Sequence, residues 1–366
     1  MTLLIIIIIL ALLFDFINGF HDAANSIATV VTTKVLTPLQ AVLWAAVFNF
    51  IAFFIAKYVI GEFGIANTVA KTVMEQFITL PIILSGLVAA IIWNLLTWWF
   101  GIPSSSSHTL IGGFAGAAIA ACGFQAIRGS TILLIASFIF LAPLVGMFGG
   151  TLITTLTLHI SRKIHPNKAE TWFKRLQLIS SAGLSIGHGL NDSQKVMGII
   201  TITLISVSYP SSPSYISNLP DFMNFFKDVD GQTISDATAF GFGKFKESQV
   251  FDWIPFSCFT VIGLGTLTGG WKIIKTMGNK ITKLSAFEGF CAQSSATLTL
   301  LLTEILHVPV STTHVITGSI MGVGATKRLS SVRWGVTRNL LTAWLLTIPV
   351  SAVLAALIYF AVSVFV

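Results

Sequence analysis

The chain has 366 residues, of which 54% are hydrophobic and only 10% are charged, and its mean hydropathy is +0.86. A single soluble core could not bury so much apolar surface, so the composition excludes a soluble domain and indicates an integral membrane protein. The net charge of +7 requires no nucleic-acid partner, because most basic residues fall in short connections between apolar segments, where membrane topology accounts for them.

Ten apolar segments follow one another along the chain, each near the ~20 residues that a membrane-spanning helix needs. The first half holds segments at about 1–31, 39–60, 78–100, 103–123 and 131–160. The second half holds segments at about 176–208, 251–271, 284–306, 309–326 and 337–366. The sequence therefore predicts an all-α polytopic membrane protein with five spans in each half.

A short hydroxyl-rich motif occurs once in each half. Residues 103–108 (PSSSSH) match residues 309–314 (PVSTTH) at an offset of 206 (309 − 103), and the same offset pairs Pro143 with Pro349. A unit with an odd number of spans inserts with the opposite orientation when it is repeated in tandem. We therefore expect two inverted-topology repeats, with broken helices and re-entrant half-helices at the midplane of the membrane.

The repeats divide the chain into three parts. We expect the first repeat at 1–160, a basic cytoplasmic linker at 161–175 and the second repeat at 176–366. Two acids at membrane depth, Asp22 and Asp192, are only 170 residues apart (192 − 22). The second repeat should therefore hold an insertion of 36 residues (206 − 170), and the polar stretch at about 209–249 is the expected place.

The basic residues give the expected orientation in the membrane. They cluster at 161–175, 272–283 and 327–338, and short loops rich in Lys and Arg stay on the cytoplasmic side. Counting crossings from these loops makes the chain a multi-pass protein of the cell membrane. Both termini and the insertion at 209–249 are then extracytoplasmic.

The two acids at membrane depth are the strongest single-residue signals. A carboxylate in a spanning segment costs about 2.5–3.5 kcal/mol on insertion scales, so it normally faces a partner or a functional cavity. Carboxylates, amides and freed backbone carbonyls bind hard cations such as sodium. The candidate cation ligands are Asp22, Asn25, Asn191 and Asp192, with sodium expected at Asp22 and Asp192.

Glycines beside these acids, Gly19, Gly187 and Gly189, would let the helices unwind and free backbone carbonyls for a cation. The alternative is a charge pair that only holds helices together, for example Lys195 with one of the aspartates. Repetition of the acid but not of the lysine favours the cation site.

The two hydroxyl-rich motifs are candidates for binding an oxyanion. Proline sets the start of a helix, and helix N-termini bind phosphate through free N–H groups and the helix dipole. In inverted repeats, two such N-termini would converge from opposite sides. The candidate phosphate ligands are Ser105, Ser106, Ser107, Thr109, Ser311, Thr312 and Thr313, with Asn25 and Lys195 beside them. The alternative is ordinary helix capping and hydrogen bonding between helices.

These residues resemble the inorganic phosphate transporter (PiT) family. The Gly-x-Asn-Asp signature of that family is matched at Gly189–Asp192 and, with His21 in place of the asparagine, at Gly19–Asp22. The resemblance extends over nearly the whole chain and includes both hydroxyl-rich motifs. The two copies differ again at Lys195, which stands where the first copy has Asn25, so the two cation sites need not be equivalent.

The resemblance implies secondary active transport of inorganic phosphate, driven by a cation gradient. Sodium drives many members of the family and protons drive others, and sulfate permeases share the architecture. It implies no cofactor apart from sodium as the coupling ion, and a homodimer is one assembly that we consider. The expected function is a sodium-coupled phosphate symporter, with a proton-coupled phosphate or sulfate permease as the alternative.

Two other classes of protein are weighed against a symporter. Ser105, His108 and Asp22 could form a hydrolase triad, but the chain has two sets of interchangeable hydroxyls and no Gly-x-Ser-x-Gly elbow. A passive anion channel is the other alternative, and accumulation against a gradient would exclude it. No ATP-binding loop of the Gly-x-x-x-x-Gly-Lys-[Ser/Thr] type is present, which argues against a pump. We therefore expect a transporter and not an enzyme.

Overall fold

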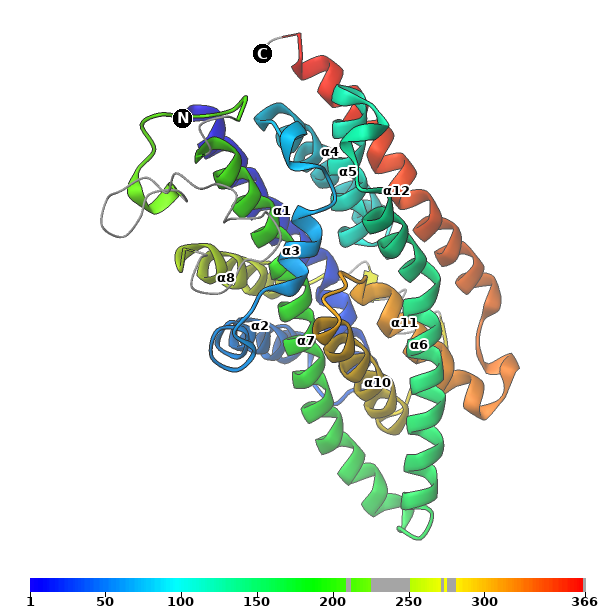
Figure 1. Ribbon diagram of the computed structural model, residues 1–366. Helices are drawn as coiled ribbons and strands as arrows, with labels where there is room; N and C mark the ends of the chain where they lie inside the picture. The colour runs from blue at the N-terminus through cyan, green and yellow to red at the C-terminus, as the bar shows by residue number, and fades with distance from the viewer. Residues whose placement is uncertain (209–211, 225–250, 271–272, 275–280, 365–366) are drawn as a thin grey trace.

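The computed structural model describes residues 1–208, 212–224, 251–270, 273–274 and 281–364 (Figure 1). Within these residues the fold is all-helical, as the sequence predicts. It has eleven α-helices and, among the described residues, no strand beyond one isolated bridge between Val73 and Ile127. Most of the insertion expected at 209–249 lies outside the described residues.

Ten of the helices match the ten predicted spans, and α3 is a further short helix. Their bounds are α1 (Thr2–Thr32), α2 (Pro38–Ile55), α3 (Gly64–Ala70), α4 (Leu80–Trp99), α5 (Ser106–Cys122), α6 (Gly129–Ser161), α7 (Pro166–Ser208), α8 (Trp253–Thr268), α10 (Ala286–Ile305), α11 (Thr312–Lys327) and α12 (Trp334–Val362). Five of them, namely α1, α2 with its continuation to Ile60, α4, α6 and α12, are long and apolar enough to cross a membrane.

The connection between the two halves is mostly helical. α6 ends at Ser161 and α7 already begins at Pro166, so the residues from 166 to 175 form the first turns of α7. Proline suits this position because an N–H group at the first helical residue would have no intrahelical acceptor. The turn between α6 and α7 lies at the opposite end of the molecule from both termini (Figure 1).

Two helical hairpins, α4–α5 and α10–α11, break the chain inside the protein. Each turns through a residue with a left-handed backbone, Gly101 (φ 65°) in the first and His307 (φ 56°) in the second, and these positions are equivalent at the offset of 206. α5 and α11 then begin at matching hydroxyl caps. The Ser105 side chain accepts from the His108 N–H at 3.2 Å, and the Ser311 side chain accepts from the His314 N–H at 3.4 Å.

Each short helix of a hairpin packs against the last long helix of the other half. α5 lies against α12, where a Cβ on Gly112 would come within 2.7 Å of the Ile348 carbonyl oxygen. α11 lies against α6, where a Cβ on Gly318 would come within 2.1 Å of the Pro143 carbonyl oxygen. Only glycine permits backbones to approach so closely. The hairpin tips are thereby brought to the middle of the molecule (Figure 1).

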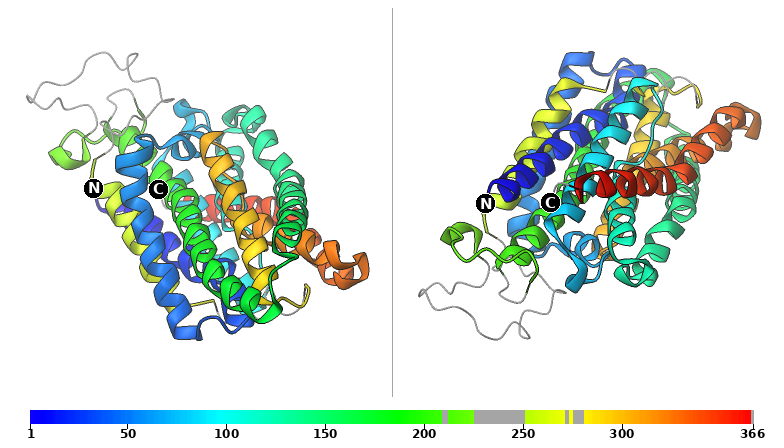
Figure 2. Two further views of the ribbon diagram at one scale, coloured as in Figure 1. Left: turned by 90° about the horizontal axis from the view of Figure 1, so that it is seen from below. Right: turned by 90° about the horizontal axis from the view of Figure 1, so that it is seen from above.

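The unwinding expected beside the two aspartates does not occur. α1 remains helical through Asp22, and α7 remains helical through Asp192. The glycines serve close packing: a Cβ on Gly19 would lie 2.3 Å from the Ile262 carbonyl oxygen, on the helix α8 that runs beside α1 (Figure 2). A Cβ on Gly189 would lie 2.7 Å from the Asn49 carbonyl oxygen of α2. The chain is interrupted at the hairpin tips instead.

We expect Gly318→Ala to destabilise the protein by about 3 kcal/mol, because its methyl group would overlap a backbone atom that cannot move aside. The measurement is the thermal unfolding temperature of the purified protein in detergent. Gly129→Ala is the matched control, since nothing lies within 4 Å of a Cβ at that position. Equal unfolding temperatures for the two variants would show that the α6–α11 contact is looser than described.

Candidate functional site

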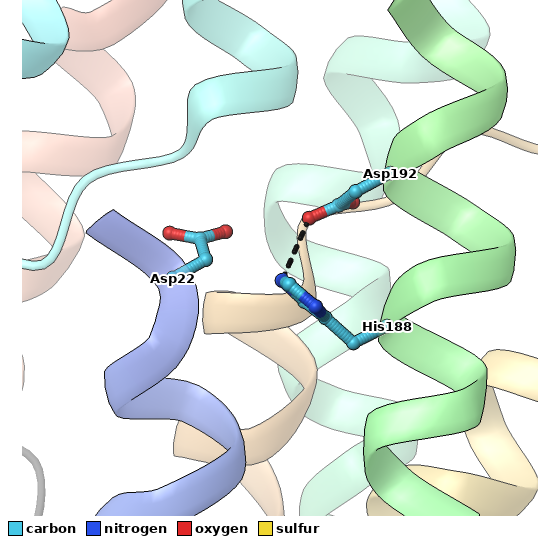
Figure 3. A group of neighbouring side chains, drawn as sticks. All are labelled: Asp22, His188 and Asp192. Carbon is cyan, nitrogen blue, oxygen red and sulfur yellow. Dashed lines mark ion pairs between the residues drawn. The ribbon is translucent and has the colours of Figure 1, made fainter. Parts of the chain in front are cut away.

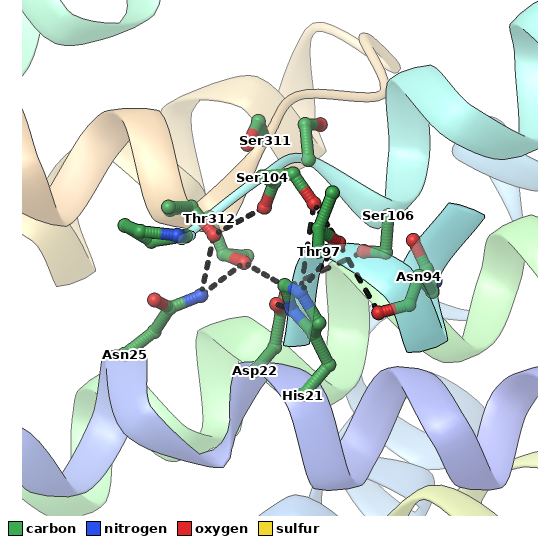
Figure 4. A network of polar contacts seen from close by, with 12 residues as sticks. His21, Asp22, Asn25, Asn94, Thr97, Ser104, Ser106, Ser311 and Thr312 are labelled. Atoms are coloured by element: carbon green, nitrogen blue, oxygen red, sulfur yellow. Dashed lines mark hydrogen bonds and ion pairs between the residues drawn. The ribbon is translucent and has the colours of Figure 1, made fainter. Parts of the chain in front are cut away.

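The two hairpin tips meet α1 and α7 in the interior of the protein (Figure 4). The predicted cation and phosphate ligands are all buried there: Asp22, Asn25, Ser105, Ser106, Ser107, Thr109, Asn191, Asp192, Lys195, Ser311, Thr312 and Thr313. Four segments that are far apart in the sequence therefore supply one polar centre that is buried from solvent.

The hairpin tips bind each other through a reciprocal pair of hydrogen bonds. Ser107 Oγ donates to the Val310 carbonyl oxygen at 3.1 Å, and Thr313 Oγ1 donates to the Ser104 carbonyl oxygen at 3.3 Å. At the offset of 206, Ser107 is equivalent to Thr313 and Ser104 to Val310. Exchanging the two halves therefore exchanges the two bonds.

Asp22 lies between the two half-helices and is held by both. Its Oδ2 accepts a hydrogen bond from Ser106 Oγ at 3.3 Å and another from Thr312 Oγ1 at 3.1 Å. These two donors are equivalent at the offset of 206. The other oxygen, Oδ1, lies 2.8 Å from His21 Nδ1. One carboxylate thus takes a donor from each repeat.

Asn25 and Lys195 occupy matching positions on α1 and α7 but differ in charge. Asn25 Nδ2 donates to Thr313 Oγ1 at 2.9 Å and to Thr312 Oγ1 at 3.2 Å. Lys195 Nζ donates to Ser107 Oγ at 2.5 Å, to Asp192 Oδ1 at 2.6 Å and to the Val310 carbonyl oxygen at 2.8 Å. Each side chain therefore reaches across to the hydroxyls of the other half.

The second aspartate completes a group that could hold a cation. His188 Nε2 lies 3.0 Å from Asp192 Oδ2, and ligand atoms of Asp22, His188 and Asp192 all fall within 4.8 Å of one another (Figure 3). Asn191 is buried beside them in the sequence, and neither atom of its amide has a hydrogen-bond partner within the described part of the chain. The two carboxylates supply the oxygen ligands that a hard cation prefers.

Three of the predicted phosphate ligands are engaged within their own helices. Ser105 and Ser311 cap α5 and α11, and Thr109 Oγ1 donates to the Ser105 carbonyl oxygen at 2.8 Å.

The hydrolase alternative finds no support in this geometry. Ser105 acts as a cap and Asp22 pairs with His21, so Ser105, His108 and Asp22 do not form a triad.

Sequence reasoning missed buried polar side chains that contact His21 and His188. His21 Nε2 lies 3.4 Å from Thr97 Oγ1 of α4, and His188 Nδ1 lies 3.3 Å from Asn49 Oδ1 of α2. The available signal was an isolated amide or hydroxyl within an apolar segment, since such residues usually face the interior of a helix bundle.

Comparison with known proteins agrees with this site. Residues 18–355 match the Phosphate transporter family. A "Probable low-affinity inorganic phosphate transporter" of Rhizobium meliloti (strain 1021) is 42% identical over 98% of this chain and 96% of its own length. A protein of the same description from Bacillus subtilis (strain 168) is 39% identical, with 98% and 97% covered.

The fold is also found among solved structures. "The sodium-dependent phosphate transporter" matches with a TM-score of 0.79 over 100% of both chains, at 24% sequence identity. This chain therefore shares the fold of that solved structure. With a family match that covers most of its length, the chain belongs to the phosphate transporter family and is a transporter, not an enzyme.

Proposed function

We propose that the chain is a symporter that carries inorganic phosphate across the cell membrane, driven by a gradient of sodium. The observation that carries this proposal is the position of Asp22, which accepts hydroxyl donors from both half-helices and lies within 4.8 Å of the Asp192–His188 pair. One carboxylate thus links the group that could bind a cation to the hydroxyls that could bind an anion. A sodium-dependent phosphate transporter with the same fold supports sodium as the coupling ion.

Cation binding would prepare the anion site. With both aspartates ionised and Lys195 protonated, these groups carry a net charge of −1 (−2 + 1), so an approaching phosphate is repelled. In the closed conformation, Asp22 also takes the Ser106 and Thr312 donors that a phosphate would use. Sodium at Asp22 and Asp192 would offset the charge and draw the carboxylate away from these hydroxyls.

The released donors would then surround the phosphate. The hydroxyls of Ser106, Ser107, Thr312 and Thr313 lie at the N-termini of α5 and α11, whose free N–H groups and dipoles favour an oxyanion. Asn25 and Lys195 add a neutral donor on one side and a positive charge on the other. Ser105, Ser311 and Thr109 would shape the binding loops through the backbone.

We also propose that residues 1–160 and 176–366 are inverted repeats and that both termini are extracytoplasmic. The reciprocal bonds between the hairpin tips support the repeats. The termini lie opposite the turn between α6 and α7, which contains the basic residues Arg162 and Lys163, and this supports the orientation (Figure 1). Homodimer formation stays a prediction.

The coupling is tested by uptake of labelled phosphate into liposomes that contain the purified protein. We expect an inward sodium gradient to drive accumulation above the outside concentration, whereas an equal potassium gradient does not. Accumulation that follows a pH gradient alone would make protons the coupling ion. Equilibration without accumulation under either gradient would indicate a passive channel.

We expect Asp22→Asn and Asp192→Asn each to lower sodium-driven uptake by at least about tenfold, because each removes a charged ligand of the proposed cation. The measurement is the initial rate in the same liposomes at equal protein content. Asp252→Asn is the matched control, since that acid is exposed at the surface in an ion pair with Lys57. Normal uptake by the Asp22→Asn, Asp192→Asn double variant would exclude these cation sites.

We expect Lys195→Met to lower the free energy of unfolding by about 3–5 kcal/mol, because it leaves the buried Asp192 carboxylate without its lysine. Adding Asp192→Asn should recover most of this loss, since the remaining pair is neutral. Denaturation of both variants in detergent measures the difference. A double variant as unstable as Lys195→Met would mean that the lysine acts through packing and not through charge.

A further inference from the structure

A third carboxylate lies inside the protein on α1, outside the site described above. Asp15 is fully buried, and neither of its carboxylate oxygens has a hydrogen-bond partner within the described residues. The other two acids differ in this respect, because Asp22 is held by Ser106, Thr312 and His21, and Asp192 is paired with Lys195. A structural charge pair therefore does not account for Asp15.

Asp15 is aligned with Asp22 along α1. Seven residues separate the two acids, which is close to two helical turns, so both lie on one face at about 10 Å along the axis. The helix is sealed here against α8, where a Cβ on Gly265 would lie 2.1 Å from the Phe16 carbonyl oxygen. Asp15 is therefore next in sequence to a close backbone contact between α1 and α8, and it lies two helical turns from Asp22.

Among the described residues, few charged groups face Asp15 from the helices packed on α1. Asp192 and Lys195 of α7 act on it with opposite sign, and Cys258 of α8 is its other titratable neighbour. α2 and α4 contain no titratable residue. α10 and α11 bond to α1 on the other side of Asp22, at Thr29 and Asn25, and on α1 itself His21 already pairs with Asp22.

These surroundings determine the charge of Asp15. An ionised carboxylate that is buried without a partner costs several kcal/mol, whereas the neutral acid avoids most of that cost. Among the described residues, Asp15 also belongs to no group of three or more His, Cys, Asp or Glu side chains placed to share a metal ion, whereas Asp22, His188 and Asp192 form such a group. A proton is the ligand that this position can take.

The acid also has no counterpart in the other half. The offset of 170 that relates Asp22 to Asp192 carries Asp15 to Ser185, whose hydroxyl donates to the Ser181 carbonyl oxygen at 3.0 Å. A helix-packing role shared by the two repeats would not need an acid in only one of them. The asymmetry favours a specific role for a single ionisable group.

We propose that Asp15 is a proton-binding site of the transport cycle. It is a neutral acid in the closed conformation described here, and it exchanges its proton with water when the contact between α1 and α8 opens. This inference rests on the proposed function, since it requires a carrier that changes conformation. The proton comes from water on the open side and binds one carboxylate oxygen. Transport requires the neutral acid, and at high pH the proton stays in water and the ionised protein does not transport.

The protonation is tested directly by infrared spectroscopy of the purified protein in lipid. We expect the wild-type protein to show the C=O band of a protonated carboxyl group that disappears in Asp15→Asn and shifts in Asp15→Glu. Asp252→Asn should leave the band unchanged, because Asp252 is exposed and paired with Lys57. A wild-type spectrum without a band that responds to either change at Asp15 would overturn the proposal.

The role in transport is tested by the pH dependence of phosphate uptake under a fixed sodium gradient. The ratio of the wild-type rate to the Asp15→Asn rate cancels the titration of phosphate itself. We expect this ratio to fall about tenfold per pH unit once Asp15 is mostly ionised, because asparagine mimics only the neutral acid. The ratio of the Asp15→Glu rate to the Asp15→Asn rate should fall with rising pH in the same way. A constant ratio over the whole range would overturn a role in the cycle.

These tests separate the inference from the function on which it rests. The infrared band reports Asp15 without any transport. If wild-type liposomes fail to accumulate phosphate under sodium, the proposed coupling fails while the band can still be present. If uptake is driven by sodium but neither the band nor the rate ratio responds to changes at Asp15, only the inference about Asp15 fails.

Discussion

The bonds that hold Asp22 between the two half-helices are the interaction on which the rest of the structure depends. One carboxylate oxygen accepts from Ser106 of α5 and from Thr312 of α11. Those helices can meet only because Gly112 and Gly318 let them approach α12 and α6 at backbone distance. The long outer helices thus fix the hairpins, and the hairpins bring equivalent hydroxyls to a single acid.

The centre is symmetric in its backbone and asymmetric in its charge. The reciprocal bonds between Ser107 and Val310 and between Thr313 and Ser104 follow the exchange of halves. Asn25 and Lys195 do not, because one is neutral and the other carries a positive charge bound to Asp192. The proposed cation sites at Asp22 and Asp192 are therefore not equivalent.

The sequence predicts the helices well because apolar segments and charged loops mark each span, and all ten predicted spans correspond to helices. Capping by Ser105 and Ser311 was the alternative that the sequence left open, and these two side chains do cap α5 and α11. It does not predict that α1 and α7 stay helical, because Gly19 and Gly189 serve contacts with Ile262 and Asn49 that are distant in the chain. Asp15 could have been recognised by the same signal as Asp22, a carboxylate within an apolar span, but it has no counterpart in the repeat, and its burial without a partner becomes visible only in the structure.

The central claim is that a cation at Asp22 and Asp192 prepares the hydroxyls for phosphate. Calorimetric titration of phosphate into the purified protein, in sodium chloride and in potassium chloride at equal ionic strength, tests it most directly. The account predicts binding in sodium, little or none in potassium, and loss of the sodium effect in Asp22→Asn. Equal phosphate affinity in the two salts would contradict it.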